Sequence, residues 1–352
     1  MKKAVMYGAG NIGRGFMGHL FYENQYETTF IDINKEVIAA LNAERKYPIR
    51  IVSNEAQEEC IIENVSGIDG GDAAAVADAI AECDIMSLAV GVNIIPKIIP
   101  NLAEGIRQRA AIGTELNIII CENKIGADSY IRGLVKEALP EELHEFIDSK
   151  VGFIEASVGR MVPVVTEEMK GDNLLRVWVE PFCMLPVDAD AFKGEIPEFT
   201  GIVPEGRFEY FIQRKLFLHN MGHCLSAYLG NLHGYTYIYE AIRNEAVSSI
   251  VLGAMYASAK ALSAEHGISL VDVMDHANDL IDRFGNRYLG DTIERVGRDL
   301  PRKLGENDRF FGIIKLCKKH GIDATYIKLG VAAAMLFGED FDTKSLNMED
   351  LK

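Results

Sequence analysis

The sequence lacks the features that mark several large classes of protein. No apolar run approaches the ~18 residues that cross a bilayer, and the N-terminus has no apolar signal-peptide core, so we expect a cytoplasmic protein. None of the 6 cysteines pairs with another as CxxC, which favours reduced thiols over disulfides or a zinc site. We therefore expect no structural disulfide and no bound metal.

Basic residues are also scarce. The chain has 36 Lys and Arg against 52 Asp and Glu, a formal net charge of −16. Such a charge repels nucleic-acid phosphates and anionic lipids, so we expect neither nucleic acid nor membrane as a partner. A small anionic substrate is compatible with it, because a few arginines can dominate one pocket. The length of 352 residues favours two domains.

The first half alternates strand-like and helix-like segments, the pattern of a parallel sheet with helices on both faces. We predict strands at 4–7, 28–33, 85–90, 116–121, 151–154 and 174–180, and helices at 12–23, 35–45, 72–81, 95–108 and 127–138. From about residue 208 the apolar spacing is helical, with predicted helices at 208–229, 238–265, 270–283, 309–320 and 325–337.

The predicted fold is therefore α/β, a Rossmann-type parallel sheet followed by a mainly α-helical domain. Turn-rich sequence near residues 190–205 marks the boundary. We place the first domain at 1–195 and the helical substrate domain at 196–352. The active site is expected in the cleft between them, where such folds bind ligands.

A glycine-rich loop follows the first predicted strand and opens a predicted helix. It comprises Gly8, Ala9, Gly10, Asn11, Ile12 and Gly13, and matches GxGxxG. In this context one glycine permits the tight turn, the second admits a pyrophosphate and the third lets the helix pack on the strand. The helix N-terminus then faces the anion, so the loop predicts a bound dinucleotide.

Asp32 ends the second predicted strand. A carboxylate there accepts hydrogen bonds from ribose hydroxyls and repels a 2′-phosphate, which favours NAD over NADP. Arg14 and Arg160 are candidates for further phosphate contacts. The alternative is a glycine turn in an unrelated α/β protein, with Asp32 capping the next helix.

A second group of polar residues opens the helical half. Lys215, His219 and His223 stack at i, i+4 and i+8 on a helix, with Asn220 on the neighbouring flank. A lysine desolvated in a cleft can act as a general base, which alcohol oxidation requires as the hydroxyl proton leaves. The alternative, of about equal weight, is an amphipathic helix with a solvated lysine and core histidines.

With the glycine loop, the spacing of Lys215, Asn220 and His223 resembles the polyol-specific long-chain dehydrogenases, the mannitol dehydrogenase family. The likeness covers nearly the whole chain. Its other motifs are Gly8-Ala9-Gly10-Asn11-Ile12-Gly13-Arg14-Gly15-Phe16, Ala89-Val90-Gly91, Cys121-Glu122-Asn123, Val151-Gly152-Phe153, Arg214-Lys215-Leu216-Phe217, Ala227-Tyr228-Leu229-Gly230, Glu294-Arg295-Val296-Gly297-Arg298 and Arg302-Lys303-Leu304.

The resemblance implies a metal-independent, NAD-linked oxidoreductase of small polyols or sugar phosphates, acting as a monomer or homodimer. Lys215 would be the general base, or the general acid in the reverse direction. Asn220 and Asn123 would donate hydrogen bonds to the developing alkoxide, and His223 would orient the substrate hydroxyls. Ala89 and Val90 would line the cofactor cleft.

The substrate is less closely defined. A basic cluster could bind a phosphate or a carboxylate, although it could equally be a solvated helix face; its members are Arg298, Arg302, Lys303 and Arg309. Because the carboxylate alternative also belongs to this family, a hexuronate (tagaturonate or fructuronate) oxidoreductase stays open.

One position departs from the family pattern. The family usually has a Val-Asp-Arg run where this chain reads Val158, Gly159 and Arg160. Glu155 is a candidate replacement for the missing acid and is as readily explained as a structural residue. Gly159 also motivates a different class of function, an NAD-binding sensor with weak catalytic activity.

Overall fold

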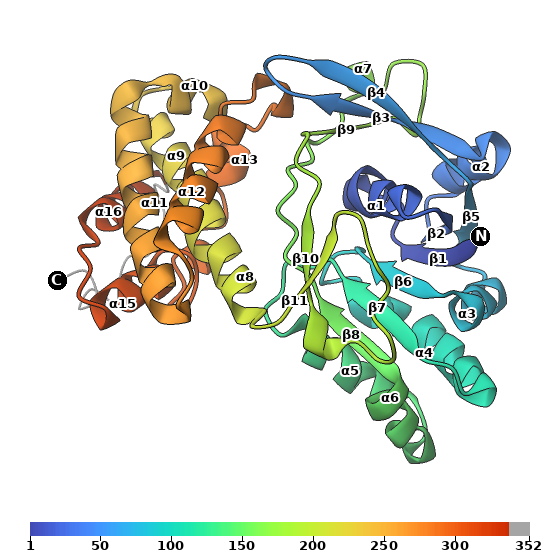
Figure 1. Cartoon of the computed structure of the whole chain (residues 1–352). Helices are drawn as coiled ribbons and strands as arrows, with labels where there is room; N and C mark the ends of the chain where they lie inside the picture. The colour runs from blue at the N-terminus through green and yellow to red at the C-terminus, as the bar shows by residue number, and fades with distance from the viewer. Residues whose placement is uncertain (338–352) are drawn as a thin grey trace. The chain divides into compact units, whose positions relative to one another are not determined.

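The computed structural model describes residues 1–337 and divides into two compact units (Figure 1). The first unit holds Met1–Val52 and Ala56–Phe208, and the second holds Ser53–Glu55 and the chain from Glu209 onward. The predicted boundary between residues 195 and 196 stays a prediction, and residues 338–352 of that second domain lie outside the described part.

The core of the first unit is a six-stranded sheet in which every paired neighbour is parallel. Its spatial order is β5-β2-β1-β6-β7-β8, so the predicted α/β fold with a Rossmann-type sheet is confirmed. The strands are β1 (Lys2–Tyr7), β2 (Tyr26–Asp32), β5 (Val65–Asp69), β6 (Ile85–Leu88), β7 (Leu116–Ile120) and β8 (Val151–Glu155). The order reverses between β1 and β6, and open sheets bind ligands at the carboxyl ends of the strands there.

Helices cover both faces of this sheet, as a parallel sheet requires. They are α1 (Gly18–Glu23), α2 (Lys35–Glu44), α3 (Ala73–Glu82), α4 (Ile95–Ile112), α5 (Ala127–Ala138) and α6 (His144–Lys150). Successive residues of β1 enter different cores: Ala4 and Met6 belong to one buried cluster, and Val5 and Tyr7 to the other. This alternation is why the strand reads as an unbroken apolar run.

Two smaller sheets complete the first unit. In one, β3 (Lys46–Val52) pairs with β4 (Gln57–Glu63) in antiparallel fashion and with β9 (Val177–Val179) in parallel. In the other, β10 (Leu185–Asp188) pairs with β11 (Ile202–Glu205). The sequence did not predict β3, β4, β5, β10 or β11, and the strand predicted at 174–180 is shorter.

The second unit is mainly helical, as predicted. Its helices are α8 (Glu209–Arg214), α9 (Met221–Leu232), α10 (Ile238–Arg243), α11 (Glu245–His266), α12 (Leu270–Phe284), α13 (Ile293–Gly297), α14 (Leu300–Lys303), α15 (Phe311–Lys319) and α16 (Thr325–Phe337), with a π-helical segment η4 (Lys215–Asn220) between α8 and α9.

The single helix predicted at 238–265 is wrong, because Asn244 divides it. This residue is extended (φ −77°, ψ 117°), and its side chain accepts hydrogen bonds from the first amides of α11. A cap of this kind starts a new helix. Among the described helices only α11 is long and apolar enough to cross a membrane, and half of its most apolar stretch is buried inside the protein.

Candidate functional site

Two glycines of the loop after β1 are required by the loop's own packing. Gly8 has a φ of +105°, and a Cβ there would collide with the carbonyl oxygen of Ala89. A Cβ on Gly13 would collide with the carbonyl oxygen of Gly8. These approaches hold the start of the helix against β1 and the residues that follow β6.

Gly10 differs from Gly8 and Gly13, because no steric contact within the described residues requires a glycine there. It is exposed, and apart from its two chain neighbours no atom of the described residues lies within 4 Å of the position its Cβ would take. The open space lies where the helix begins, beside backbone amides that have no partner within a helix. A dinucleotide pyrophosphate fits this arrangement, since it requires close approach to bare backbone.

Asp32, at the end of β2, holds this loop. Its Oδ2 accepts a hydrogen bond from the amide of Ala9 at 2.7 Å, and its Oδ1 accepts from the amide of Asn34 at 2.9 Å. The N-cap of α2 is Asn34, whose side chain accepts from Val37 at 3.2 Å. The alternative in which Asp32 merely caps the next helix is therefore wrong.

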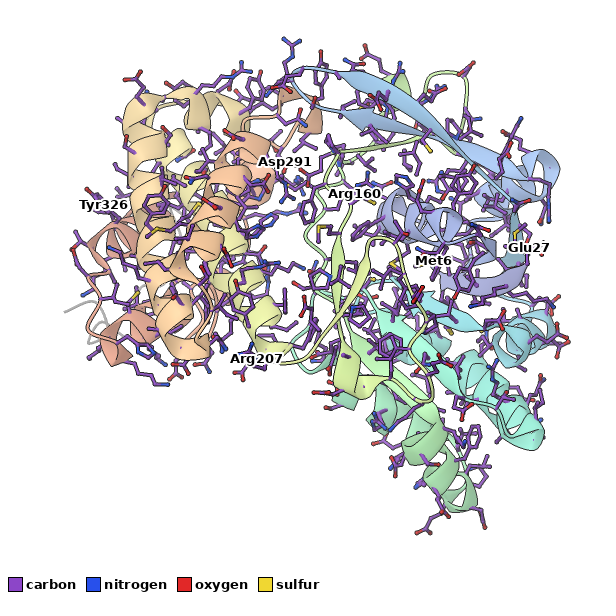
Figure 2. All side chains as sticks on the ribbon, viewed as in Figure 1. Met6, Glu27, Arg160, Arg207, Asp291 and Tyr326 are labelled. Carbon is purple, nitrogen blue, oxygen red and sulfur yellow. The ribbon has the colours of Figure 1, made fainter. Side chains whose placement is uncertain are left out.

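The two arginines considered as phosphate contacts are buried and bonded to the backbone. Arg14 donates to the carbonyl oxygens of Ala9 and Leu175, at 2.8 and 2.5 Å. Arg160, labelled in Figure 2, donates to the carbonyl of Glu180 at 2.8 Å and to that of Gly15 at 3.0 Å. Both guanidinium groups join the loop and its helix to residues that flank β9, so a phosphate-binding role is not supported.

The loop after β6 is fixed by a carboxylate that the sequence analysis did not select. Oε1 of Glu122 accepts hydrogen bonds from the amides of Val90 at 2.7 Å and Gly91 at 2.8 Å. Burial raises the pKa of Glu122, and the two amide hydrogen bonds oppose that shift. Asn123 follows it in the exposed loop between β7 and α5. For Glu122 the sequence offered one signal, its position directly after the strand predicted at 116–121.

The remaining residues of this region have local roles. Asn11 donates from Nδ2 to the carbonyl of Pro163 at 3.2 Å, while Ile12 packs against the apolar core. Oε1 of Glu155 accepts from the amide of Ala127 at 3.0 Å, at the start of α5, which supports its structural explanation. A Cβ on Gly159 would lie 3.4 Å from the ring of Phe182, an ordinary van der Waals contact.

The lysine-bearing helix of the second unit is not α-helical throughout. The segment Lys215–Asn220 is a π-helix, so the continuous α-helix predicted at 208–229 is corrected here. Hydrogen bonds in a π-turn join residues five apart, so Lys215 and Asn220 lie one turn apart on one side of the helix. Both are half-buried, and π-turns often occur at functional sites.

The two histidines of this helix meet an aromatic ring and an acid. His223 stacks on Phe284 with a centroid distance of 4.9 Å, and its Nε2 lies 3.3 Å from Oδ2 of Asp291. Burial raises the pKa of Asp291, yet its interactions with His223 and then with Arg295 outweigh burial and leave that pKa lowered. Burial lowers the pKa of His219 well below its usual value.

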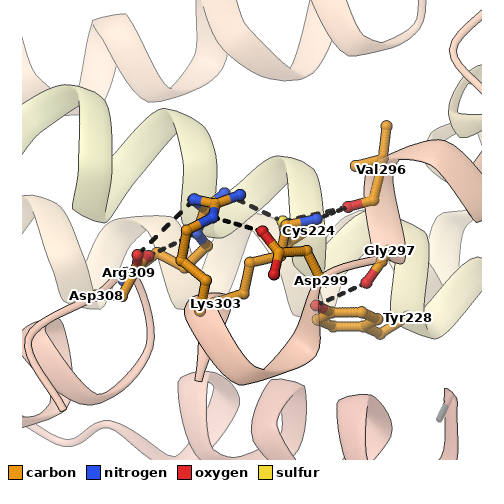
Figure 3. Close-up of polar contacts among 9 residues, drawn as sticks. Cys224, Tyr228, Val296, Gly297, Asp299, Lys303, Asp308 and Arg309 are labelled. Carbon is orange, nitrogen blue, oxygen red and sulfur yellow. Dashed lines mark hydrogen bonds and ion pairs between the residues drawn. The ribbon is translucent and has the colours of Figure 1, made fainter. Parts of the chain in front are cut away.

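The basic cluster predicted to bind a phosphate is largely engaged by protein groups (Figure 3). Nζ of the buried Lys303 donates to the carbonyl of Val296 at 2.6 Å, and the buried Arg309 bonds Asp308 at 2.8 Å. Arg302 pairs with Asp299 at 2.5 Å, while Arg298 is exposed. A substrate role for the cluster remains a prediction, and these contacts favour a structural role for Lys303 and Arg309.

Comparison with known proteins connects both units to one family. Residues 2–201 match the mannitol dehydrogenase Rossmann domain, and residues 207–351 match the mannitol dehydrogenase C-terminal domain. The chain is 36% identical to a mannitol-1-phosphate 5-dehydrogenase of Thermoanaerobacter pseudethanolicus over 99% of its own length and 89% of the relative's. It is 37% identical to the mannitol-1-phosphate 5-dehydrogenase of Brevibacillus brevis, over 98% of its own length and 89% of the relative's.

Two solved structures have the same fold. A D-sorbitol dehydrogenase in substrate-free form superposes with a TM-score of 0.82 at 18% identity, covering 97% of this chain and 81% of the other. The Pseudomonas fluorescens mannitol 2-dehydrogenase in ternary complex with NAD and D-mannitol superposes with a TM-score of 0.75 at 20% identity. The match covers 97% of this chain and 80% of the other. With both family domains matched in order along one chain, this protein belongs to the mannitol dehydrogenase family.

Proposed function

We propose that the chain is an NAD-dependent dehydrogenase of the cytoplasm that interconverts D-mannitol 1-phosphate and D-fructose 6-phosphate. The observation that carries the cofactor assignment is the glycine loop, in which Gly10 alone presents open space. The substrate assignment rests on the two relatives, which are mannitol-1-phosphate 5-dehydrogenases at 36% and 37% identity over nearly the whole chain.

The first unit would hold NAD. The amides at the start of the loop helix would bind its pyrophosphate, with Gly10 leaving room for it. Each oxygen of Asp32 already accepts one amide and has capacity for another donor, so both can meet the ribose hydroxyls. Its negative charge would repel a 2′-phosphate, which is why we propose NAD rather than NADP. When bound, the nicotinamide supplies the acceptor or donor of the hydride.

The second unit would handle the proton. During oxidation the C5 hydroxyl loses its proton to a neutral Nζ of Lys215 while the C5 hydride departs, leaving a ketone. During reduction the charged Nζ returns the proton to the nascent alkoxide. Asn220, one π-turn along, would donate a hydrogen bond to that oxygen together with Asn123. The proposal uses no metal ion.

An NADH absorbance assay tests the proposal. The folded protein is mixed with NADH and, separately, fructose 6-phosphate, fructose, tagaturonate or fructuronate. We expect fructose 6-phosphate to be reduced fastest; faster turnover of a uronate would make this a hexuronate reductase. No turnover of any of them by a protein that binds NADH would refute the enzyme and favour the sensor that Gly159 suggested.

Replacing the lysine tests the mechanism. We expect Lys215→Ala to lower kcat by roughly 10²- to 10⁴-fold, the usual contribution of general acid–base catalysis. The dissociation constant of NADH should not change, because the proposed cofactor contacts lie in the other unit. A parallel loss of turnover and NADH binding would mean that Lys215 is structural.

A further inference from the structure

The histidine of the proposed site is held by a largely buried acid that no motif singled out. Asp291 lies just before α13 (Figure 2), and its side chain is 11% exposed. One carboxylate oxygen is 3.3 Å from Nε2 of His223, and the other accepts from the guanidinium of Arg295. Asp291 thus joins a residue of α9 to one of α13.

The ring of His223 has little freedom to leave this arrangement. It is nearly parallel to Phe284, with 16° between the planes, and the ring of His219 stands at 6.2 Å from its centroid. A stacked imidazole that also meets a carboxylate has its plane and its in-plane orientation both fixed.

The carboxylate also decides where the proton of a neutral ring resides. An ionised carboxylate only accepts hydrogen bonds, and a neutral imidazole has one donor nitrogen and one acceptor nitrogen. Facing Asp291, Nε2 must therefore be the donor, which makes Nδ1 the acceptor. Among the described residues, Nδ1 of His223 has no hydrogen-bond partner.

We propose that Asp291 is a positioning residue that keeps His223 in the Nε2–H tautomer, so that Nδ1 accepts a hydrogen bond from a substrate hydroxyl. The identity of the substrate rests on the proposed function, whereas the tautomer does not. A hydroxyl can donate to Nδ1, but a carboxylate or a carbonyl oxygen cannot. The arrangement therefore selects a polyol hydroxyl at this position.

Nitrogen-15 NMR of the histidine rings tests the tautomer directly in the wild-type protein. The chain has 8 histidines, so the signal of His223 is assigned as the one lost in His223→Asn. At the pH of maximal activity we expect a protonated Nε2 and an unprotonated Nδ1. A proton on Nδ1, or on both nitrogens, would overturn the proposal whatever the enzyme acts upon.

The variant Asp291→Asn tests the consequence. An asparagine amide can donate to Nε2 and so place the ring proton on Nδ1, in the wrong tautomer. We expect kcat/KM to fall about 10- to 100-fold, as for one misplaced hydrogen bond at a site, with NADH binding unchanged. The matched control is Asp172→Asn, an exposed acid that also pairs with an arginine four residues on, and it should leave kcat/KM unchanged.

A purely structural role would give a different result. Thermal unfolding compares Asp291→Asn with the wild type, and Asp291→Glu restores a carboxylate if the asparagine variant does not fold. We expect the glutamate variant to recover the Nε2–H signal and part of kcat/KM. An asparagine variant that folds, changes tautomer and keeps full kcat/KM would refute the positioning role, while the proposed function would stand.

Discussion

The two kinds of glycine in the nucleotide loop predict opposite outcomes for one substitution. Gly10→Ala adds a methyl group where no atom of the described residues, other than those next to it in the chain, lies within 4 Å, and its φ is not positive. Gly13→Ala adds the same group against the carbonyl oxygen of Gly8. The first should therefore affect only what binds the loop, and the second should affect the loop itself.

The magnitudes follow from packing. Replacing glycine by alanine in a compatible backbone stabilises a protein by about 0.4–1 kcal/mol, so Gly10→Ala should unfold at the same temperature or slightly higher. The added methyl would overpack the bound pyrophosphate, at a cost of about 1–3 kcal/mol. That raises the dissociation constant of NADH roughly 5- to 150-fold. For Gly13→Ala the same cost of about 1–3 kcal/mol falls on the free energy of unfolding.

Urea unfolding and NADH fluorescence titration measure the two quantities on the same samples. The matched control is Gly133→Ala, at an exposed position of α5 where an added Cβ would meet no non-adjacent atom of residues 1–337 within 4 Å. It should stabilise the protein by about 0.5–1 kcal/mol and leave NADH binding unchanged. If folded Gly10→Ala binds NADH as tightly as the wild type, the dinucleotide does not approach this loop and the cofactor assignment is refuted.

Two further predictions concern other groups. Glu122→Ala should weaken NADH binding about 10-fold, because the amides of Val90 and Gly91 lose their acceptor. Glu122→Gln should bind NADH nearly normally, since a single oxygen accepts from both amides. Equal losses of NADH affinity in the two variants, measured by titration, would contradict this. Burial lowers the pKa of His276 to about 3 from 6.5, so the unfolded chain binds a proton that the folded chain does not, and stability should fall as pH drops below about 6.5. His276→Gln should remove up to about 1.4 kcal/mol per pH unit of that slope in urea unfolding at pH 7 to 5, and an unchanged slope would argue against the buried neutral ring.

The sequence predicted the central elements of the first unit because their signals are local. Strands buried on both faces, such as β7, read as apolar runs, and α5 has the predicted bounds, 127–138. The peripheral strand β4 has no such signal, since only Ile62 of its seven residues is fully buried. Strand β5 contains Gly67, which lets α2 pack closely through Ile38 but lowers strand propensity.

The site was predictable to the same extent and for the same reason. The glycine loop and the lysine-bearing helix are contiguous motifs, so spacing alone located them. Glu122 and Asp291 act through contacts with segments distant in sequence. The position of Glu122 directly after a predicted strand was its one local signal, and Asp291 had none. The π-turn at Lys215 was also hidden, because apolar periodicity cannot separate it from an α-turn over so few residues.

The acids at the sheet edge share one structural principle. Asp32 accepts the amide of Ala9, Glu122 accepts two amides after β6, and Glu155 accepts the first amide of α5. Each acid ends or follows one parallel strand and fixes the loop after the neighbouring strand. An acid at this position is therefore a loop-positioning residue before it is a ligand, which applies to Asp32 itself. Replacing Asp32 with alanine would remove both amide hydrogen bonds and disturb the glycine loop as well as cofactor choice. Asparagine keeps an acceptor for Ala9 and removes the charge, and it gives up only the bond from Asn34, so Asp32→Asn is the milder test of discrimination between NAD and NADP.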